Sequence, residues 1–506
     1  MKKVIFVNSV WLRVALTLLV LLCLQPCVNV KAQTIQSAQY QFPSRLGWDA
    51  VVRESAGGVP VISYRSAGGA YFAYGDPSTG YVLELSINDT LMVGNNSISY
   101  KINDMRVIGD MCYFCGVRMY THGELDPETG AQIVDSIGIL GRFYLNPSGS
   151  GLTGKFDLKH FPETKRIDRM TIYGRNIPGF GNDTVVAMIG IMQNFGSPSC
   201  LIVAKLKVTP VWEYIVRYAD NYSGMDEIFT DITSNMNKIV IASYIRGVGE
   251  ENYFYLRTAE RDSVRINNFG QFDTRYKYDL LQLSDSCFSL VRPDNAIVRL
   301  CTVPWAKKLY ASFACNMNST HSLYPTALCE ITTDNMDMIG VQVVRKTYIT
   351  PYTLIDMKYL YKVYNDENDA TVALLHNTNE IYKTVVEYPQ ALTSNCSTYY
   401  KMLVQQLVDS KMLSLSAYNG NDIRFGGVYG ETPTKLTYLQ ELQPLLFSKS
   451  LCMENNDADV FATQKNVISE PENRPLVCKQ QEMNSLVWGK KSAGVTAINA
   501  VNTCSY

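Results

Sequence analysis

The chain has 506 residues, of which 46% are hydrophobic, and 46 basic against 47 acidic side chains give it a formal net charge of −1. This balance argues against a nucleic-acid-binding protein, which needs basic patches to neutralise phosphates, and against polybasic attachment to an anionic membrane. The 33 tyrosines, together with many Val, Ile and Thr residues, favour strands. We therefore expect an all-β protein with an extensive core.

Residues 1–32 are expected to be a cleaved secretory signal peptide. Lys2, Lys3 and Arg13 supply its positive region and residues 14–24 its apolar stretch. An anchor is the alternative, but the apolar run is about half of the roughly 20 residues that a spanning helix needs. Cleavage would leave 42 basic against 47 acidic residues, a net charge of −5, and no further transmembrane segment. The predicted location is the periplasm, the cell surface or the extracellular space.

A short motif, in which an aspartate between apolar residues precedes a run of β-forming residues, recurs along the chain. Its aspartates are Asp104, Asp168, Asp231 and Asp356, with a weaker copy at Asp279. The first three lie 64 and 63 residues apart, and the fourth follows 125 residues later. Such a fixed period is typical of repeat architectures. Because this Asp motif recurs once per repeat, we interpret its aspartate as a structural anchor that accepts backbone N–H bonds.

Each period is predicted to contain about four short strands, separated by turns rich in Gly, Asn, Asp and Pro. The expected strands are 170–173, 184–192, 200–208 and 212–218 in the second copy, 231–235, 238–246, 252–260 and 263–267 in the third, and 287–292, 296–303, 309–316 and 327–332 in the fourth. The strand after the aspartate is the most apolar, which indicates burial on both faces. Four antiparallel strands per unit predict a β-propeller of six or seven blades, with tandem β-sandwiches as the alternative.

The repeat region is expected to span residues 33–435. Residues 436–506 differ in pattern and are predicted to form a closing blade or a small C-terminal appendage. Near-helical spacing of apolar residues makes 397–413 a candidate surface helix, and 437–449 has a similar pattern.

Four cysteines, Cys287, Cys301, Cys315 and Cys329, follow one another at intervals of 14 residues. An antiparallel repeat of strand and turn would place them at similar heights on neighbouring strands. They are then either buried thiols, since free Cys behaves as a small hydrophobe, or partners in one or two disulfides.

Neither a metal site nor a cofactor site is indicated. Cys112 and Cys115 are three residues apart, so in a strand they face opposite sides and cannot bind zinc together. The four histidines show no metal-ligand or catalytic-triad spacing. The recurrent aspartates could form the carboxylate pair of a glycoside hydrolase, although their repetition favours the structural role.

Three segments resemble a pattern found in secreted proteins of gut and oral Gram-negative anaerobes whose activity is not established. They are residues 103–105, 111–116 and 139–143, with the sequences Asn-Asp-Met, Met-Cys-Tyr-Phe-Cys-Gly and Ile-Leu-Gly-Arg-Phe. The resemblance covers roughly residues 40–430. It implies an exported β-propeller-like protein and supplies no site residues.

The sequence therefore predicts an exported binding or interaction module with a protein or glycan ligand on one rim. The first alternative is a carbohydrate-active hydrolase or lyase that uses carboxylates at the mouth of the propeller channel. The second is a structural envelope protein without a small ligand. No catalytic residue can be assigned from the sequence.

Overall fold

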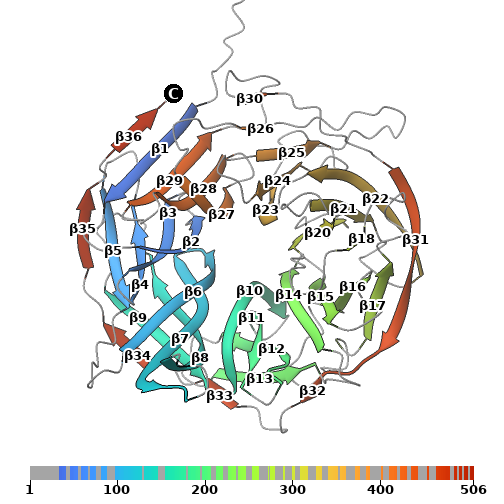
Figure 1. Cartoon of the computed structure of the whole chain (residues 1–506), viewed down its shortest axis with the longest axis horizontal. Helices are drawn as coiled ribbons and strands as arrows, with labels where there is room; N and C mark the ends of the chain where they lie inside the picture. Colours follow the sequence, from blue (N-terminus) through green and yellow to red (C-terminus); the bar gives the residue numbers. More distant parts are fainter. Residues whose placement is uncertain are drawn as a thin grey trace, which may run out of the picture.

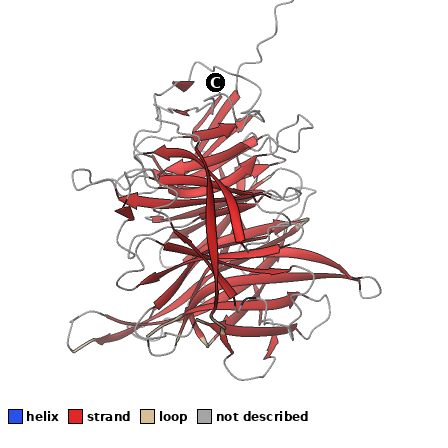
Figure 2. Cartoon of the chain, turned by 90° about the vertical axis from the view of Figure 1, so that its right-hand side faces the viewer, coloured by secondary structure: helices blue, strands red, loops and turns tan. Residues whose placement is uncertain are grey.

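The structure is a computed structural model in which every described regular element is a strand (Figure 2), so the prediction of an all-β protein is confirmed. The described residues are 34–41, 46–54, 59–66, 69–75, 81–87, 97–127, 130, 132–145, 154–177, 181–193, 196–206, 212–219, 226–234, 238–246, 253–260, 272, 274–279, 289–290, 299–302, 308–316, 326–332, 340–350, 354–360, 371–376, 383–387, 401–402, 410–418, 422–429, 435–442, 453–454, 463–478, 484–486, 489–492, 495–499 and 502–505.

Three antiparallel sheets follow one another in the first part of the chain, each built from four consecutive strands. The first contains β2 (Leu46–Glu54), β3 (Pro60–Ser66), β4 (Gly69–Tyr74) and β5 (Tyr81–Ile87). The second contains β6 (Ser97–Ile108), β7 (Met111–Leu125), β8 (Gln132–Tyr144) and β9 (Lys155–Phe161). The third contains β10 (Thr164–Ile177), β11 (Gly181–Met192), β12 (Ser199–Leu206) and β13 (Trp212–Tyr218).

The same arrangement continues through residue 442. The next strands are β14 (Asp226–Ser234), β15 (Lys238–Arg246), β16 (Tyr253–Glu260) and β17 (Thr274–Asp279), then β18 (Ser289–Leu290), β19 (Arg299–Thr302), β20 (Lys308–Asn316), β21 (Thr326–Thr332) and β22 (Gly340–Thr350). They are followed by β23 (Leu354–Leu360), β24 (Thr371–His376), β25 (Lys383–Glu387) and β26 (Lys401–Met402), and by β27 (Ser410–Tyr418), β28 (Asp422–Tyr429) and β29 (Lys435–Leu442). The N-terminal strand β1 (Thr34–Gln41) pairs with β29, so strands from both ends of this region share one sheet.

The sheets are arranged in chain order around a common centre (Figure 1). Strands β2, β6, β10, β14, β23 and β27 lie nearest the centre, and the later strands of each sheet lie progressively further out. We call the strands nearest the centre the inner strands.

The residues after 452 form a C-terminal belt that supplies outer strands to the other sheets. The belt consists of β30 (Met453–Glu454), β31 (Thr463–Asn473), β32 (Val477–Cys478), β33 (Asn484–Leu486), β34 (Gly489–Ser492), β35 (Val495–Asn499) and β36 (Asn502–Ser505). Strand β30 pairs with β26, β31 pairs with β22 and β17, and both β32 and β33 pair with β13. Strand β34 pairs with β9, β35 with β5 and β36 with β1. The belt therefore follows the periphery in the reverse of chain order (Figure 1). It covers backbone edges that would otherwise offer unpaired N–H and C=O groups.

The core lies between neighbouring sheets. Along β7, Cys112 and Phe114 pack in a cluster with the β2–β5 sheet, whereas Tyr113 and Cys115 pack in a cluster with the β10–β13 sheet. Successive side chains of β11 likewise pack alternately in the clusters on the two sides of its sheet. The expectation that these strands are buried on both faces is confirmed, as is the prediction that Cys112 and Cys115 face opposite sides.

Two segments with near-helical spacing are strands where the structure describes them. Within 437–449, the residues up to 442 belong to β29, and within 397–413 the described residues belong to β26 and β27. Strand β29 pairs with β28 on one side and β1 on the other. Pairing on both edges overrides the weak local pattern.

The third copy of the repeat also differs from its prediction. Its fourth strand is β17, which pairs with β16, whereas the segment 263–267 lies outside the described residues. In the next unit β18 and β19 both pair with β20, and β22 adds a further strand beyond β21. The segment 436–506 contributes β29 and the belt, and thus extends the other sheets.

Candidate functional site

The Asp motif marks a β-bulge in an inner strand. The pairing register of β6 with β7 shifts just before Asp104, and the same shift occurs before Asp231 in β14 and before Asp356 in β23. A bulge adds a residue to one strand and re-aims the side chain that follows. On β7, Gly116 lies opposite this bulge, where a Cβ atom would collide with the carbonyl oxygen of Lys101. The glycine that ends the apolar run is therefore required by the bulge.

The bulge in β10 corrects the expected role of Asp168. The register skips Asp168 and pairs Arg169 with Ile189, so Arg169 has the position that Asp104 has in β6. The Asp168 carboxylate instead lies 3.0 Å from Nε of Arg166, at a partly exposed site. Aligning the aspartates in sequence was therefore wrong by one residue in this copy.

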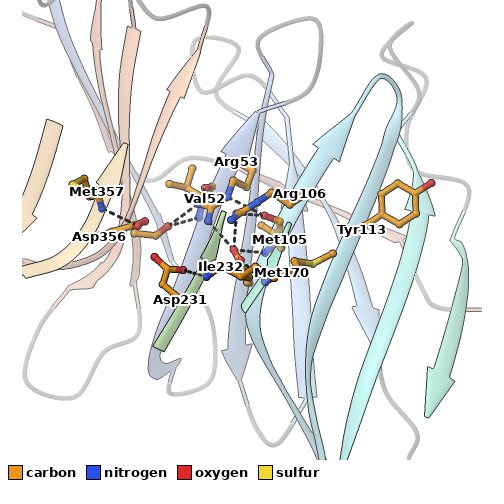
Figure 3. Close-up of polar contacts among 12 residues, drawn as sticks. Val52, Arg53, Met105, Arg106, Tyr113, Met170, Asp231, Ile232, Asp356 and Met357 are labelled. Carbon is orange, nitrogen blue, oxygen red and sulfur yellow. Dashed lines mark hydrogen bonds and ion pairs between the residues drawn. The ribbon is translucent and has the colours of Figure 1, made fainter. Parts of the chain in front are cut away.

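Asp104 links two neighbouring sheets. Its Oδ1 accepts a hydrogen bond from the Met105 backbone N–H at 2.9 Å, and its Oδ2 accepts one from the Met170 N–H of β10 at 3.1 Å (Figure 3). Hydrogen bonds to an ionised group contribute about 1.5–3 kcal/mol each. Since both carboxylate oxygens are used, Asp104 is a clamp between inner strands.

The same clamp recurs further round the centre. Asp231 accepts from the Ile232 N–H at 2.9 Å and, on its other oxygen, from the Leu300 N–H of β19 at 2.8 Å. Asp356 accepts from the Met357 N–H at 2.9 Å. All three motif aspartates in this position are buried. We predicted the acceptor role from the sequence, but the link to the next sheet depends on the bulge register.

Ser414 fills this position in β27. It follows the register shift with β28, and its hydroxyl oxygen accepts a hydrogen bond from the Val52 N–H of β2 at 3.2 Å. The clamp thus also joins the last inner strand to the first. Sequence reasoning missed Ser414 because no aspartate marks this copy.

Two arginines complete the environment of Asp104. Nη2 of Arg53 lies 2.8 Å from Oδ1 of Asp104, and Nη1 of Arg106 lies at the same distance from that oxygen (Figure 3). Arg53 also donates to the carbonyl oxygen of Met105 at 3.0 Å and to Ser414 Oγ at 3.2 Å. Burial lowers the pKa of Arg53, and the Asp104 carboxylate opposes that effect. Asp104 therefore holds a buried cation as well as two backbone donors.

Arginines alternate with the aspartates at the centre. Arg299 precedes Leu300 as Arg169 precedes Met170, so both arginines occupy the position before the clamped N–H. We call Asp104, Arg169, Asp231, Arg299 and Asp356 the central ring.

The charges of the central ring act on one another. Burial alone would lower the pKa of Arg169, but the carboxylates of Asp231, Asp104 and Asp356 raise it above its ordinary value. Burial, together with the positive charge of Arg169, lowers the pKa of Arg299 to about 10, although the same three carboxylates oppose this effect. Side chains from five different strands therefore converge at the centre.

Asp279 does not belong to this ring. It is the last residue of β17, the fourth strand of its sheet, and it pairs in register with Tyr253. The inner position expected for this copy is taken by Arg299 on β19. The weak motif at Asp279 thus coincides with an outer strand.

The four evenly spaced cysteines are not opposite one another where they are described. Cys301 pairs in register with Tyr310 of β20, and Cys329 pairs with Ala311 of the same strand from its other side. Strand β20 lies between the two, so they are two strand steps of about 4.8 Å apart, or about 9.6 Å, which exceeds the Cα separation of about 7 Å that a disulfide tolerates. Cys315 lies four residues further along β20, opposite Leu290. Cys301 is a buried, reduced thiol, as the first of the two alternatives predicted for it. Cys287 lies outside the described residues, and a disulfide between it and Cys315 or Cys329 stays a prediction.

A second buried charge cluster was not recognised from the sequence. The Glu227 carboxylate accepts hydrogen bonds from Nε and Nη2 of Arg257 at 3.0 and 2.6 Å, from Ser243 Oγ at 2.8 Å and from Arg275 Nη1 at 3.1 Å. Burial would raise the pKa of Glu227, but the two arginines together with Ser243 lower it. Arg275 also contacts Glu472 of β31 at 2.7 Å. The cluster fastens the belt to the β14–β17 sheet.

Comparison with known proteins finds no matching family model and no matching curated relative. Among the described residues, no group of three or more His, Cys, Asp or Glu side chains is placed to hold a metal ion. The described part of the chain also contains no helix of the length and apolarity needed to cross a bilayer.

Proposed function

We propose that the chain is a seven-bladed β-propeller that acts, after export, as a binding or interaction module. The order of the sheets supports seven blades, which are β2–β5, β6–β9, β10–β13, β14–β17, β18–β22, β23–β26, and β27–β29 completed by β1. Belt strand β31 pairs with both β17 and β22, which accounts for the merging of two blades into one ten-stranded sheet.

Exposed apolar side chains on one blade carry the proposal of an interaction surface. Among the described residues, the exposed large hydrophobic side chains are Leu125 (59%), Val134 (48%), Tyr144 (48%) and Ile108 (42%), all on β6, β7 or β8. Leu125 and Val134 lie toward the β7–β8 turn, where the strands continue beyond their buried half. Ile108 and Tyr144 lie at the opposite end of these strands, next to the β6–β7 turn, so the proposed surface rests on the neighbouring pair Leu125 and Val134.

The β7–β8 turn lies on the rim where propeller partners would be expected to bind. In an antiparallel sheet, the turn between the second and third strands lies on the same side as the connection to the next sheet. Loops on that rim vary without disturbing the core, so function concentrates in them. The proposed ligand is a protein or a glycan, as the sequence predicted.

The proposal also includes export of the protein and its relationship to a group of secreted proteins. They are supported by the signal-peptide pattern of residues 1–32 and by the resemblance to secreted proteins of gut and oral anaerobes. The alternative of a carbohydrate-active hydrolase or lyase is less well supported. Both oxygens of Asp104 and of Asp231 accept backbone N–H bonds, which leaves neither carboxylate placed for proton transfer to a sugar.

The test is a screen of the purified protein on glycan arrays, with product release measured in parallel, and cross-linking in the native envelope. The double variant Leu125→Ser/Val134→Ser should lose the interaction that the wild type shows. Glu124→Gln, an exposed change on the same strand, should keep it. Retention of every interaction by the double variant would reject this surface, and release of sugar product would favour the enzyme.

A further inference from the structure

The edge of β8 that faces away from β7 is only partly covered by a neighbouring strand. Strand β9 pairs with residues 138–143 of β8, whereas residues 132–137 pair with β7 alone among the described strands. Strand β6 likewise pairs with β7 only as far as Thr121. We call residues 122–125 and 132–137, which extend beyond the rest of the sheet, the arm. A strand edge without a neighbour offers backbone N–H and C=O groups to another chain.

The outward backbone groups of the arm belong to Gln132, Val134 and Ser136. The carbonyl oxygen of Ser136 accepts a hydrogen bond from Nε2 of Gln193, which follows β11 in the next sheet, so this oxygen points away from β7. Backbone groups of alternate residues in an antiparallel strand point to the same edge, which places those of Val134 and Gln132 beside those of Ser136. Among the described residues, no hydrogen bond engages the outward N–H and C=O of Val134.

Exposed apolar side chains lie beside these backbone groups. Val134 is 48% exposed and Leu125 is 59% exposed. Leu125 pairs with Gln132, two residues from Val134, so Leu125 and Val134 project from the same face of the arm. The opposite face carries Asp135, whose Oδ2 lies 2.7 Å from Nε2 of His122. The edge thus combines open backbone groups with apolar side chains, which is the combination that strand addition uses.

We propose that the β8 edge pairs antiparallel with the same edge of a second copy of the chain, about a two-fold axis that passes through Val134. In this register Val134 lies opposite Val134 of the second copy, Ile133 lies opposite Asp135, and Gln132 lies opposite Ser136. The two Val134 residues exchange both of their outward N–H···O=C bonds. The inference rests on the proposed function, because it names the partner of the surface that carries Val134.

The edge is complementary to itself in both charge and apolar character. Each Asp135 lies opposite an isoleucine and keeps its own partner His122, so no like charges face each other across the axis. The two Val134 side chains meet at the centre, and the axis brings Leu125 of both copies onto the same face. A closed two-fold contact of this kind uses the same patch on both subunits, which is the commonest arrangement among oligomers.

Sedimentation velocity of the full-length purified protein over a range of concentrations should show a dimer in equilibrium with the monomer. Val134→Pro removes the outward N–H but no donor of the ladder with β7. It should raise the dissociation constant of the dimer about tenfold or more. Val134→Ile is the matched control, because it keeps the N–H and a β-branched side chain, and it should leave the dissociation constant unchanged.

Val134→Cys tests the register. Because the axis passes through this position, the two new thiols would stand on Cα atoms about 5.5 Å apart, within the range of a disulfide. Tyr144→Cys is the matched control, since Tyr144 is also 48% exposed but ends β8 far from the arm. Mild oxidation should give a covalent dimer with the first variant only, and peptide mass spectrometry should find position 134 linked to itself.

A dimer that Val134→Pro weakens and Val134→Cys traps would support the proposal. A wild type that stays monomeric at every concentration, a dimer that Val134→Pro leaves unchanged, or equal trapping of the two cysteine variants would overturn it. If Val134→Pro does not fold, the trapping experiment decides. Failure here is distinct from failure of the proposed function, because a monomer can still bind a glycan or another protein through Leu125 and Val134, which the array and the envelope cross-linking measure.

Discussion

Replacing Asp104 by Asn tests whether the central carboxylates act as clamps between sheets. The change keeps the size of the side chain but removes its charge and turns one acceptor into a donor. In the wild type, one oxygen accepts from Met105 N–H and two arginines, and the other accepts from Met170 N–H. An Asn side chain can serve only one of these two groups, so either a backbone N–H or the buried Arg53 loses its acceptor.

The expected cost is set by the uncompensated buried charge. Asp104 is 0% exposed and the Arg53 side chain only 8% exposed. Removing one partner of a buried ion pair lowers the free energy of unfolding by about 3–5 kcal/mol. Asp168→Asn is the matched control, because Asp168 was equivalent in sequence but its ion pair with Arg166 has side-chain exposures of 31% and 56%. Such a pair contributes about 0–1 kcal/mol.

Urea unfolding followed by intrinsic fluorescence measures both variants against the wild type. Asp104→Asn should lose at least about 2 kcal/mol more than Asp168→Asn, from the difference of the two ranges. Adding Arg53→Gln to Asp104→Asn should restore part of the stability, because it removes the stranded cation. Equal losses in Asp104→Asn and Asp168→Asn would refute the clamp, because the buried contacts of Asp104 would then contribute no more to stability than the exposed ion pair of Asp168.

Three further predictions concern buried groups and the belt. Folding lowers the pKa of Glu227, so the contribution of this carboxylate to stability is complete above about pH 4.5 and is lost as the pH falls through the lowered value. Glu227→Gln should therefore lose less stability on acidification than the wild type does. Urea unfolding at several pH values measures the difference. Burial raises the pKa values of Cys112, Cys115 and Cys200, so iodoacetamide should leave these three thiols unmodified in the native protein and alkylate them in urea, as peptide mass spectrometry can show; labelling of Cys112 under native conditions would contradict the burial. Deleting residues 453–506 should expose sheet edges and raise the oligomeric fraction in size-exclusion chromatography, whereas an unchanged oligomeric state would show that the belt does not protect them.

The sequence predicted what depends on local pattern. The apolar run at 111–116 gave a strand buried on both faces, because its consecutive residues pack against different sheets. The aspartates at 104, 231 and 356 were recognised because three copies of the bulge carry the same residue. Ser414 and Arg169 occupy the same position with different side chains, so only the pairing register could find them.

Features that depend on pairing across long sequence separations could not be predicted. Most belt strands have between two and five residues, too few to show a period, and β36 pairs with β1 from the other end of the chain. The Glu227 cluster escaped notice for the same reason, since its partners Arg257, Arg275 and Glu472 come from three other strands. The near-helical spacing of 437–449 did not indicate strand β29, because its strand conformation is imposed by pairing with two neighbouring strands.

The belt also has a consequence for the time course of folding. Its strands dock in the reverse of chain order, so β36 and β1 meet only once the chain has been made as far as residue 505. Contacts between such distant segments form slowly, because the intervening loop must close before they stabilise anything. Sheets built from consecutive strands can form early and locally, while their outermost edges stay open until the belt arrives. The interval between these two events is the period in which a growing or newly released chain is most exposed to strand exchange with its neighbours.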